Sequence, residues 1–184
     1  MPTRIEPPAA AAGTDPMVPA IVSAMREGWW EDGALATALS RRPESLKTTV
    51  GLVETLYTKS GIDPVLLELL RIQVAESRDD QYGMKIRVKQ FEEAVEARRR
   101  EGVTGPDAIA LQLADRSIRN PHSVDDDFFA VVQEHFTEHQ IVGLQFAISV
   151  FGMASLIAIG LHLDTEPDSP YGSGLIYRQD RLRN

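Results

Sequence analysis

Apolar and polar residues follow one another along this chain with the period of an α-helix. Apolar residues recur every three or four positions between short polar interruptions, and no segment shows the strict alternation that is typical of a strand. The pattern predicts helices at about 17–27, 31–40, 44–58, 64–77, 80–101, 106–119, 124–135 and 138–163. The chain is therefore expected to fold as an all-α bundle.

The helix expected at 64–77 carries a wide apolar stripe. Asp63 and Pro64 are suited to its N-cap and first turn, and the apolar positions that follow are Leu66, Leu67, Leu69, Leu70, Ile72 and Val74. Polar residues then interrupt the pattern, and Asp79 or Asp80 can cap a second helix. Unpaired N–H groups and the positive end of the helix dipole favour a carboxylate at such a place. We expect a core helix followed by a polar helix start.

Two later boundaries are marked by capping residues. Gly102 is suited to end the helix at 80–101. Ser123 with Asp126 is expected to cap the helix that follows. Signals of this kind place a boundary to within a few residues.

Residues 141–163 are almost wholly apolar and, at ~20 residues, about long enough to cross a bilayer. Acidic residues flank this segment on both sides, and neither end carries the Lys or Arg residues that accompany membrane spans. A buried helix is the better interpretation, because hydrophobicity on all sides is expected of the central helix of an oligomeric bundle.

Composition limits the possible partners. A chain of 184 residues is long enough for one domain and short for two. Its net charge of -8 and pI near 5.0 disfavour nucleic-acid binding. The first residues contain no apolar signal-peptide segment. We therefore expect a cytoplasmic protein whose partners include neither nucleic acid nor a membrane.

The chain divides into three parts by composition. Residues 1–16 are rich in proline and alanine and are expected to form a flexible leader. Residues 17–164 form the helical domain. Residues 165–184 are rich in Pro, Gly, Ser and Arg and form either a disordered tail or an arm lying on a neighbouring subunit. The apolar run Leu175, Ile176 and Tyr177 favours the arm.

The stretch at 66–90 resembles the signature of the alkylhydroperoxidase (AhpD-like) and carboxymuconolactone decarboxylase family. That signature is a helix with a glutamate, a short turn, a Cys-x-Tyr-Cys sequence that opens the next helix, and a histidine four residues later. Here the glutamate corresponds to Glu68 and the tyrosine to Tyr82. Asp80 and Gly83 stand at the two cysteine positions, and Arg87 stands at the histidine position.

The resemblance extends over residues 35–165. Residues 39–46, 120–128 and 135–142 are similar to the family's segments before and after the signature. The resemblance implies an AhpD-like helical bundle that assembles as a homo-oligomer, a trimer or a hexamer. The family's thiol chemistry does not carry over, because a peroxide is reduced by a thiolate and the chain contains no cysteine.

The signature positions supply the candidate catalytic residues. Glu68, between two leucine pairs, could be desolvated and act as a general acid or base. Arg87 could hold a substrate carboxylate. Asp80 and Tyr82 complete the candidate site.

Each candidate also has a structural interpretation. Glu68 can pair with Arg71 three residues later, and Arg87 can belong to a solvated basic run. Asp80 can be a simple N-cap. Tyr82 can be a packed aromatic residue with its hydroxyl at the surface.

No cofactor or metal site is expected. His135 and His139 lie four residues apart, but Thr137 with Gln140 forms a capping box that starts a new helix after His135, so the two histidines belong to different helices. The sequence contains no Walker loop, no dinucleotide fingerprint and no nucleophile elbow.

Two functions follow from these patterns. The first is a cofactor-independent acid/base lyase or decarboxylase that acts on a small, fairly apolar organic acid or carbonyl compound. The second is a non-catalytic relative that binds a small molecule or serves in assembly. An open pocket on which Glu68 and Arg87 converge would favour the first, and a salt-bridged Glu68 would favour the second.

Overall fold

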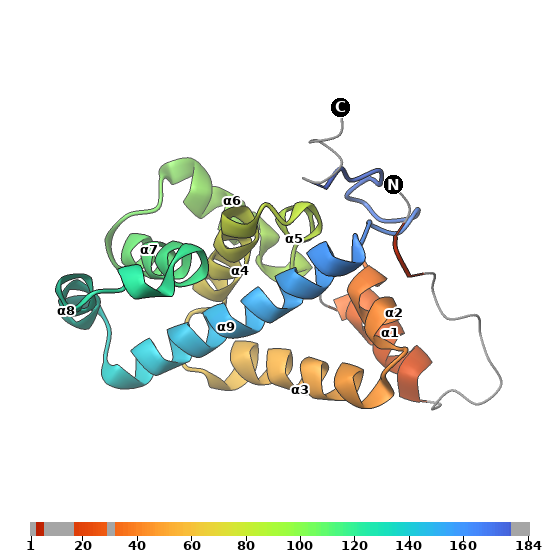
Figure 1. Cartoon of the computed structure of the whole chain (residues 1–184), viewed down its shortest axis with the longest axis horizontal. Helices are drawn as coiled ribbons and strands as arrows, with labels where there is room; N and C mark the ends of the chain where they lie inside the picture. The colour runs from red at the N-terminus through yellow and green to blue at the C-terminus, as the bar shows by residue number, and fades with distance from the viewer. Residues whose placement is uncertain (1–2, 6–16, 29–31, 178–184) are drawn as a thin grey trace.

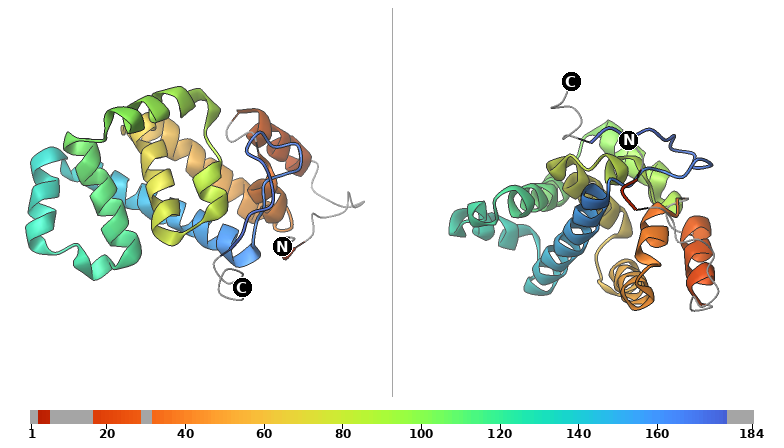
Figure 2. Two further views of the ribbon diagram at one scale, coloured as in Figure 1. Left: turned by 90° about the horizontal axis from the view of Figure 1, so that it is seen from above. Right: turned by 45° about the vertical axis from the view of Figure 1, so that its right-hand side comes forward.

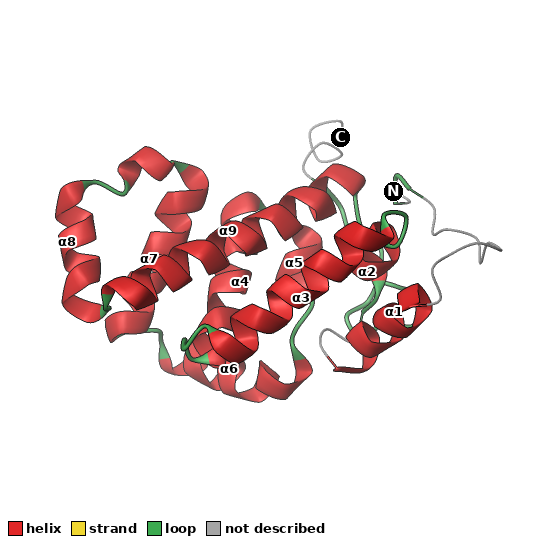
Figure 3. Ribbon diagram, turned by 90° about the horizontal axis from the view of Figure 1, so that it is seen from below, coloured by secondary structure: helices red, strands yellow, loops and turns green. Residues whose placement is uncertain are grey.

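The computed structural model describes residues 3–5, 17–28 and 32–177. These residues form helices and no strand (Figures 1 and 3), so the all-α prediction is confirmed. The elements are α1 (Met17–Gly28), α2 (Ala34–Leu39), α3 (Pro43–Lys59), α4 (Pro64–Arg78), α5 (Gln81–Lys85), α6 (Lys89–Glu101), α7 (Gly105–Arg119), the 3-10 helix η1 (Pro121–Ser123), α8 (Asp126–His135) and α9 (Glu138–Leu161).

Helix α4 is the centre of the bundle. Helices α3, α5, α6, α7 and α9 all pack against it (Figure 2). Leu67 and Leu70 are fully buried in these contacts. The Asp63 side chain accepts the backbone N–H of Val65 at 3.0 Å, and Pro64 occupies the first turn. The predicted start of this helix is confirmed.

Helix α9 crosses the front of the molecule in Figure 1. By length and composition it could cross a membrane, with a mean hydropathy of 2.0 in its most apolar window. Half of that window is buried within the chain, where α9 packs on α3, α4 and α7. Leu144, Ala147 and Ile148 are among its fully buried side chains. Such burial is typical of a core helix.

The prediction of a single helix over residues 80–101 is wrong. The chain forms the short helix α5, leaves the helical conformation at Ile86 and Val88, and begins α6 at Lys89. The break arises because backbone groups of residues 83–88 bond to the side chains of Glu68 and Arg71 rather than to each other. The helical spacing of apolar residues does not reveal such contacts, because it depends only on residues that are close in sequence.

Other helix ends agree with the sequence in part. Gly102 ends α6 with a positive φ of 88°, as predicted. The cap expected from Ser123 and Asp126 is wrong, because the Asp125 side chain caps α8 by accepting the backbone N–H of Phe128. Of the helix expected at 31–40, residues 34–39 are helical and residue 31 lies outside the described residues.

The segment after α9 packs on its own chain. Asp164 accepts the backbone N–H groups of Thr165, Gly174 and Leu175, which closes residues 164–175 into a compact loop. The ring of Tyr177 stacks on His162 with ring centroids 4.6 Å apart. Residues 165–177 therefore lie against their own chain, while 178–184 lie outside the described residues. The expected contact of this segment with a neighbouring subunit stays a prediction.

A short part of the N-terminal leader lies beside this segment (Figure 1). The backbone N–H of Arg4 donates to the carbonyl of Leu161 at 2.9 Å, and its guanidinium donates to the carbonyl of Gly160 at 3.0 Å. These contacts satisfy carbonyl groups at the end of α9 that have no helical partner. The remaining leader residues, 1–2 and 6–16, lie outside the described residues.

The central position of α4 predicts a large effect of truncation. We expect Leu67→Ala to lower the free energy of unfolding by about 2–5 kcal/mol, because Leu67 is fully buried and its removal leaves a cavity. Ile176→Ala, at a side chain that is 57% exposed, should change it by less than about 0.5 kcal/mol. Urea denaturation measures both. Similar losses for the two variants would contradict this packing.

Candidate functional site

Glu68 and Arg71 form a buried ion pair on α4. Nε of Arg71 donates to Oε2 of Glu68 at 2.8 Å, and Nη2 donates to Oε1 at 2.6 Å. The Glu68 side chain is fully buried and the Arg71 side chain is 7% exposed. Burial alone would lower the pKa of Arg71, but the Glu68 carboxylate raises it above its ordinary value. Arg71 is therefore positively charged where it contacts Glu68.

Both partners also hold groups from other elements. Glu68 accepts the hydroxyl of Tyr57 at 3.0 Å and the backbone N–H of Val88 at 3.1 Å. Arg71 donates to the carbonyls of Gly83 at 2.7 Å and Ile86 at 2.6 Å. Four hydrogen bonds occupy the Glu68 carboxylate, so none of its acceptor positions faces an open space.

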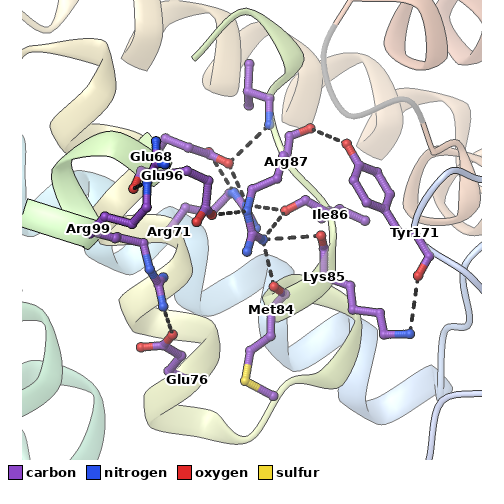
Figure 4. A network of polar contacts seen from close by, with 12 residues as sticks. Glu68, Arg71, Glu76, Met84, Lys85, Ile86, Arg87, Glu96, Arg99 and Tyr171 are labelled. Carbon is purple, nitrogen blue, oxygen red and sulfur yellow. Dashed lines mark hydrogen bonds and ion pairs between the residues drawn. The ribbon is translucent and has the colours of Figure 1, made fainter. Parts of the chain in front are cut away.

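Arg87 does not converge on Glu68. Its Nη1 donates to the carbonyls of Met84 at 2.7 Å, Ile86 at 2.9 Å and Lys85 at 3.2 Å, and Nε lies 3.5 Å from Oε1 of Glu96 (Figure 4). These contacts satisfy the orphan carbonyls at the end of α5. The guanidinium serves as a cap in this arrangement.

Tyr82 is buried together with its hydroxyl. The hydroxyl donates to Oδ1 of Asp32 at 2.9 Å and accepts the backbone N–H of Leu35 at 3.3 Å. Oδ2 of Asp32 accepts the backbone N–H of Glu166 at 2.8 Å. Burial, and then the Asp32 carboxylate, raise the pKa of Tyr82 well above its ordinary value. The surface hydroxyl expected from the sequence is corrected.

Asp32 connects α5 to the start of α2 and to the segment after α9, and it was not identified from the sequence. It accepts hydrogen bonds from these three parts of the chain and is 2% exposed. Glu166, which donates to it, also pairs with Arg26 of α1 and accepts the backbone N–H of Gly33. The contact of Asp32 with Ala34 is local, but Tyr82 and Glu166 are far away along the chain, so the sequence does not reveal this network.

Asp80 is the N-cap of α5, as predicted. Its Oδ1 accepts the backbone N–H of Gly83 at 3.1 Å, and the side chain is 2% exposed. Burial raises the pKa of the Asp80 carboxyl to about 6, although the Gly83 N–H, the nearby Ser155 hydroxyl and the Arg71 charge oppose the rise. A carboxyl with such a pKa changes its charge close to neutral pH.

Gly83 has no room for a side chain. A Cβ atom placed on it would lie 2.5 Å from Oδ2 of Asp80 and 3.0 Å from Cβ of Ala75. The Asp80 carboxylate therefore fills the space that a side chain at position 83 would need. The two residues fit each other as a pair.

An apolar pocket opens beside Asp80. Its cavity volume is about 40 Å³, and the wider empty space, counting the part that joins the solvent, is about 540 Å³. Its polar groups come from Asp80, Ser155, Thr49 and Arg71, and its apolar lining includes Leu35, Val53, Ile86, Val150, Phe151 and Ala158. The pocket brings together Asp80, Tyr82 and Gly83 of α5, while Glu68 and Arg87 do not line it.

Ser155, on the long helix α9, was not identified from the sequence as a site residue. It is 3% exposed, and its Oγ makes no hydrogen bond of acceptable geometry within the described part of the chain. The hydroxyl is close enough to Asp80 to affect its pKa without being aligned for a hydrogen bond. A buried unsatisfied hydroxyl at a pocket wall is a natural point for binding a ligand or water.

The structure is similar to solved structures of AhpD-like proteins. An uncharacterized peroxidase-related protein from Silicibacter sp. TM1040 aligns with a TM-score of 0.73 and 14% identity, over 91% of this chain and 94% of that one. An uncharacterized peroxidase-related protein with an alkylhydroperoxidase AhpD core, from Ralstonia eutropha JMP134, aligns with a TM-score of 0.72 and 14% identity, over 90% of this chain and 93% of that one.

The chain has the AhpD-like fold. A protein of unknown function from Agrobacterium tumefaciens is a more distant match, with a TM-score of 0.52 and 16% identity over 68% of this chain and 92% of that one. No protein-family model and no curated protein matches the sequence. At these identities the likeness establishes the fold and leaves the activity open.

Within the AhpD-like fold, the pair Asp80 and Gly83 occupies the positions that the resemblance assigns to two cysteines. The described residues include no group of three His, Asp or Glu side chains placed to hold a metal ion. His135 ends α8 and His139 lies in the first turn of α9, which the Thr137 and Gln140 capping box starts as predicted. The expectation that no metal or cofactor is used stays a prediction.

The ion pair predicts that Glu68 is needed for folding. We expect Glu68→Gln to lower the free energy of unfolding by about 3–5 kcal/mol, because it leaves the Arg71 charge buried and unbalanced. Glu76→Gln, on the same helix, removes a partly exposed pair with Arg99 and should cost less than about 1 kcal/mol. Urea denaturation at neutral pH compares them. Equal stability of the two variants would show that Glu68 is not committed to the pair.

The raised pKa of the Asp80 carboxyl predicts that the stability of the protein depends on pH. A pKa raised from 3.8 to about 6 means that the folded protein holds the Asp80 proton more tightly than the unfolded chain. The resulting stabilisation is full below about pH 4 and is lost as the pH rises through 6, by roughly 3 kcal/mol. In Asp80→Asn, which keeps a capping side chain, this contribution should vanish. The difference in unfolding free energy between the two proteins, measured from pH 4 to 7, tests it, and a constant difference would contradict it.

Proposed function

We propose that this protein binds a small, largely apolar molecule in the pocket beside Asp80 and does so without thiol chemistry. The observation that carries the proposal is the pairing of two buried polar groups, Asp80 and the unsatisfied Ser155, with a wall that is otherwise apolar. Pockets of this make-up are typical of small-molecule sites. This is the binding alternative that the sequence left open.

The charges in the pocket favour a ligand that donates a hydrogen bond. Asp80, with a pKa of about 6, is mostly ionised at neutral pH and accepts hydrogen bonds. Arg71 also reaches the pocket, but Glu68 neutralises its charge. An alcohol or amine head is therefore favoured over the organic acid expected from the sequence, because a carboxylate would face Asp80.

Acid/base chemistry is a second candidate function, and the raised pKa of Asp80 favours it. A general base works best when its pKa lies near the operating pH. In such a lyase or decarboxylase the proton would move to Asp80, and not to Glu68, whose acceptor positions are all occupied. A turnover that rises with an apparent pKa near 6 and disappears in Asp80→Asn would support this activity.

A matched set of ligands tests the binding proposal. Titration calorimetry with hexanol, hexylamine and hexanoate at neutral pH should detect the first two, with hexanoate much weaker. Ser155→Ala should weaken hexanol binding by roughly 3- to 10-fold, because one hydrogen bond is lost. Ser45→Ala removes an exposed hydroxyl of α3 and should leave binding unchanged.

Two results would contradict the binding proposal. One is the absence of binding for all three probes to the folded wild-type protein. The other is preferential binding of hexanoate, which would mean that Arg71 and not Asp80 sets the polarity of the pocket.

A further inference from the structure

Helix α9 presents an apolar stripe to solvent. Val142, Phe146, Met153 and Leu156 are 70%, 48%, 37% and 56% exposed. With Ser149 they are spaced by four, three, four and three residues, which is the spacing of helices that pack on one another along a seam. We call these five residues the α9 stripe. A soluble chain rarely leaves such a contiguous apolar surface uncovered.

The α9 stripe is uncharged along its whole length. No acidic or basic residue occurs between Gln140 and Leu161. The one hydroxyl of the stripe, on Ser149, donates to the carbonyl of Gln145 at 2.8 Å and needs no other partner. The stripe can therefore be dehydrated without leaving a charge or a hydroxyl unsatisfied.

Opposite charges stand at the two ends of this helix. Glu138 lies in the first turn of α9. Arg4, at the other end, is exposed and donates to the carbonyl of Gly160. If two copies of α9 lie antiparallel, Arg4 of each copy comes near Glu138 of the other, and the two helix dipoles also oppose each other favourably.

A groove beside the stripe provides room for the second helix. It lies between the end of α3 and the start of α9, and it is lined by Leu56, Lys59, Val142, Gly143 and Phe146 among others. Its empty space is about 840 Å³, counting the part that joins the solvent. In an antiparallel pair this groove faces the Leu156 end of the other stripe, whose leucine is more than half exposed.

The stripe and the pocket meet at Met153. This side chain belongs to the exposed stripe and also lines the pocket beside Asp80, next to Ala154 and Ser155. Anything that covers the middle of the stripe therefore also covers this wall of the pocket. No described element crosses in front of α9 in Figure 1.

We propose that a second copy of this chain packs antiparallel on the α9 stripe, about a two-fold axis, and closes the pocket at Met153. A two-fold contact uses the same patch on both copies, as a self-complementary stripe requires. The closure of the pocket rests on the proposed function, whereas the pairing does not. The binding site for a small molecule is complete only when two chains are paired.

Measurement of mass in solution tests the pairing. Analytical ultracentrifugation of the full chain should show a dimer, or an even-numbered assembly built from dimers. Val142→Glu should raise the dissociation constant by about 100-fold, because it buries an unpaired charge. Ile176→Glu introduces the same charge at an exposed apolar side chain away from α9 and should have no effect.

Charge reversal tests the antiparallel direction. Glu138→Arg should weaken association, and the combination of Glu138→Arg with Arg4→Glu should restore it. A monomeric wild type at all concentrations, a trimer, or a failure of the double variant to recover would overturn the proposed pair. Flotation of the wild-type monomer with phosphatidylcholine vesicles would overturn it as well, because a lipid surface and not a second chain would then cover the stripe.

Hexanol binding separates the closure of the pocket from the proposed function. Val142 does not line the pocket, so Val142→Glu should weaken hexanol binding only by separating the chains, and the affinity of the wild type should fall on dilution below the dimer dissociation constant. Equal affinity in monomer and dimer would overturn the closure and leave the proposed function intact. Absence of hexanol binding in the wild-type dimer would refute the proposed function, while the mass measurements would still decide the pairing.

Discussion

The buried ion pair between Glu68 and Arg71 determines the path of the chain around the pocket. Its two side chains bond the backbone of residues 83–88, which therefore needs no regular secondary structure to satisfy its polar groups. The same bonds turn the chain between α5 and α6 and hold α5 against α4. A charged pair at such a place is costly to bury and still more costly to break, so it acts as a structural constraint on this region.

This constraint indicates a structural role for Glu68, although the resemblance makes Glu68 a candidate catalytic residue. A glutamate retained at a family position suggests retained chemistry, but here each acceptor position of the carboxylate is occupied. The carboxyl that lines the pocket is that of Asp80. Its carboxylate occupies the space that a side chain at Gly83 would need, so the residues at these two positions depend on each other. Relative to the signature that the sequence resembles, a single acid group stands where a pair of thiols is expected.

Much of this structure follows from local pattern, and the rest depends on contacts distant in sequence. The helices, the Asp63 and Asp80 caps and the Glu68 pair with Arg71 were predictable, because each involves residues within one turn of helix. The break after α5 was not, since the partners of its backbone lie on α4. The role of Asp32 was equally hidden, because Tyr82 and Glu166 approach it only in the folded chain.

Helix α9 carries two surfaces that sequence hydrophobicity cannot tell apart. Met153 and Ser155 are two residues apart, and a helix turns by about 200° over that interval, so Ser155 is buried in the pocket wall while Met153, at the edge of the same pocket, is 37% exposed. In the proposed pair, the second chain would cover Met153 on the outer surface and leave the Ser155 hydroxyl on the inner one. The proposed pairing through α9 and the proposed ligand binding beside Asp80 would therefore be coupled through Met153, the side chain that the two surfaces share.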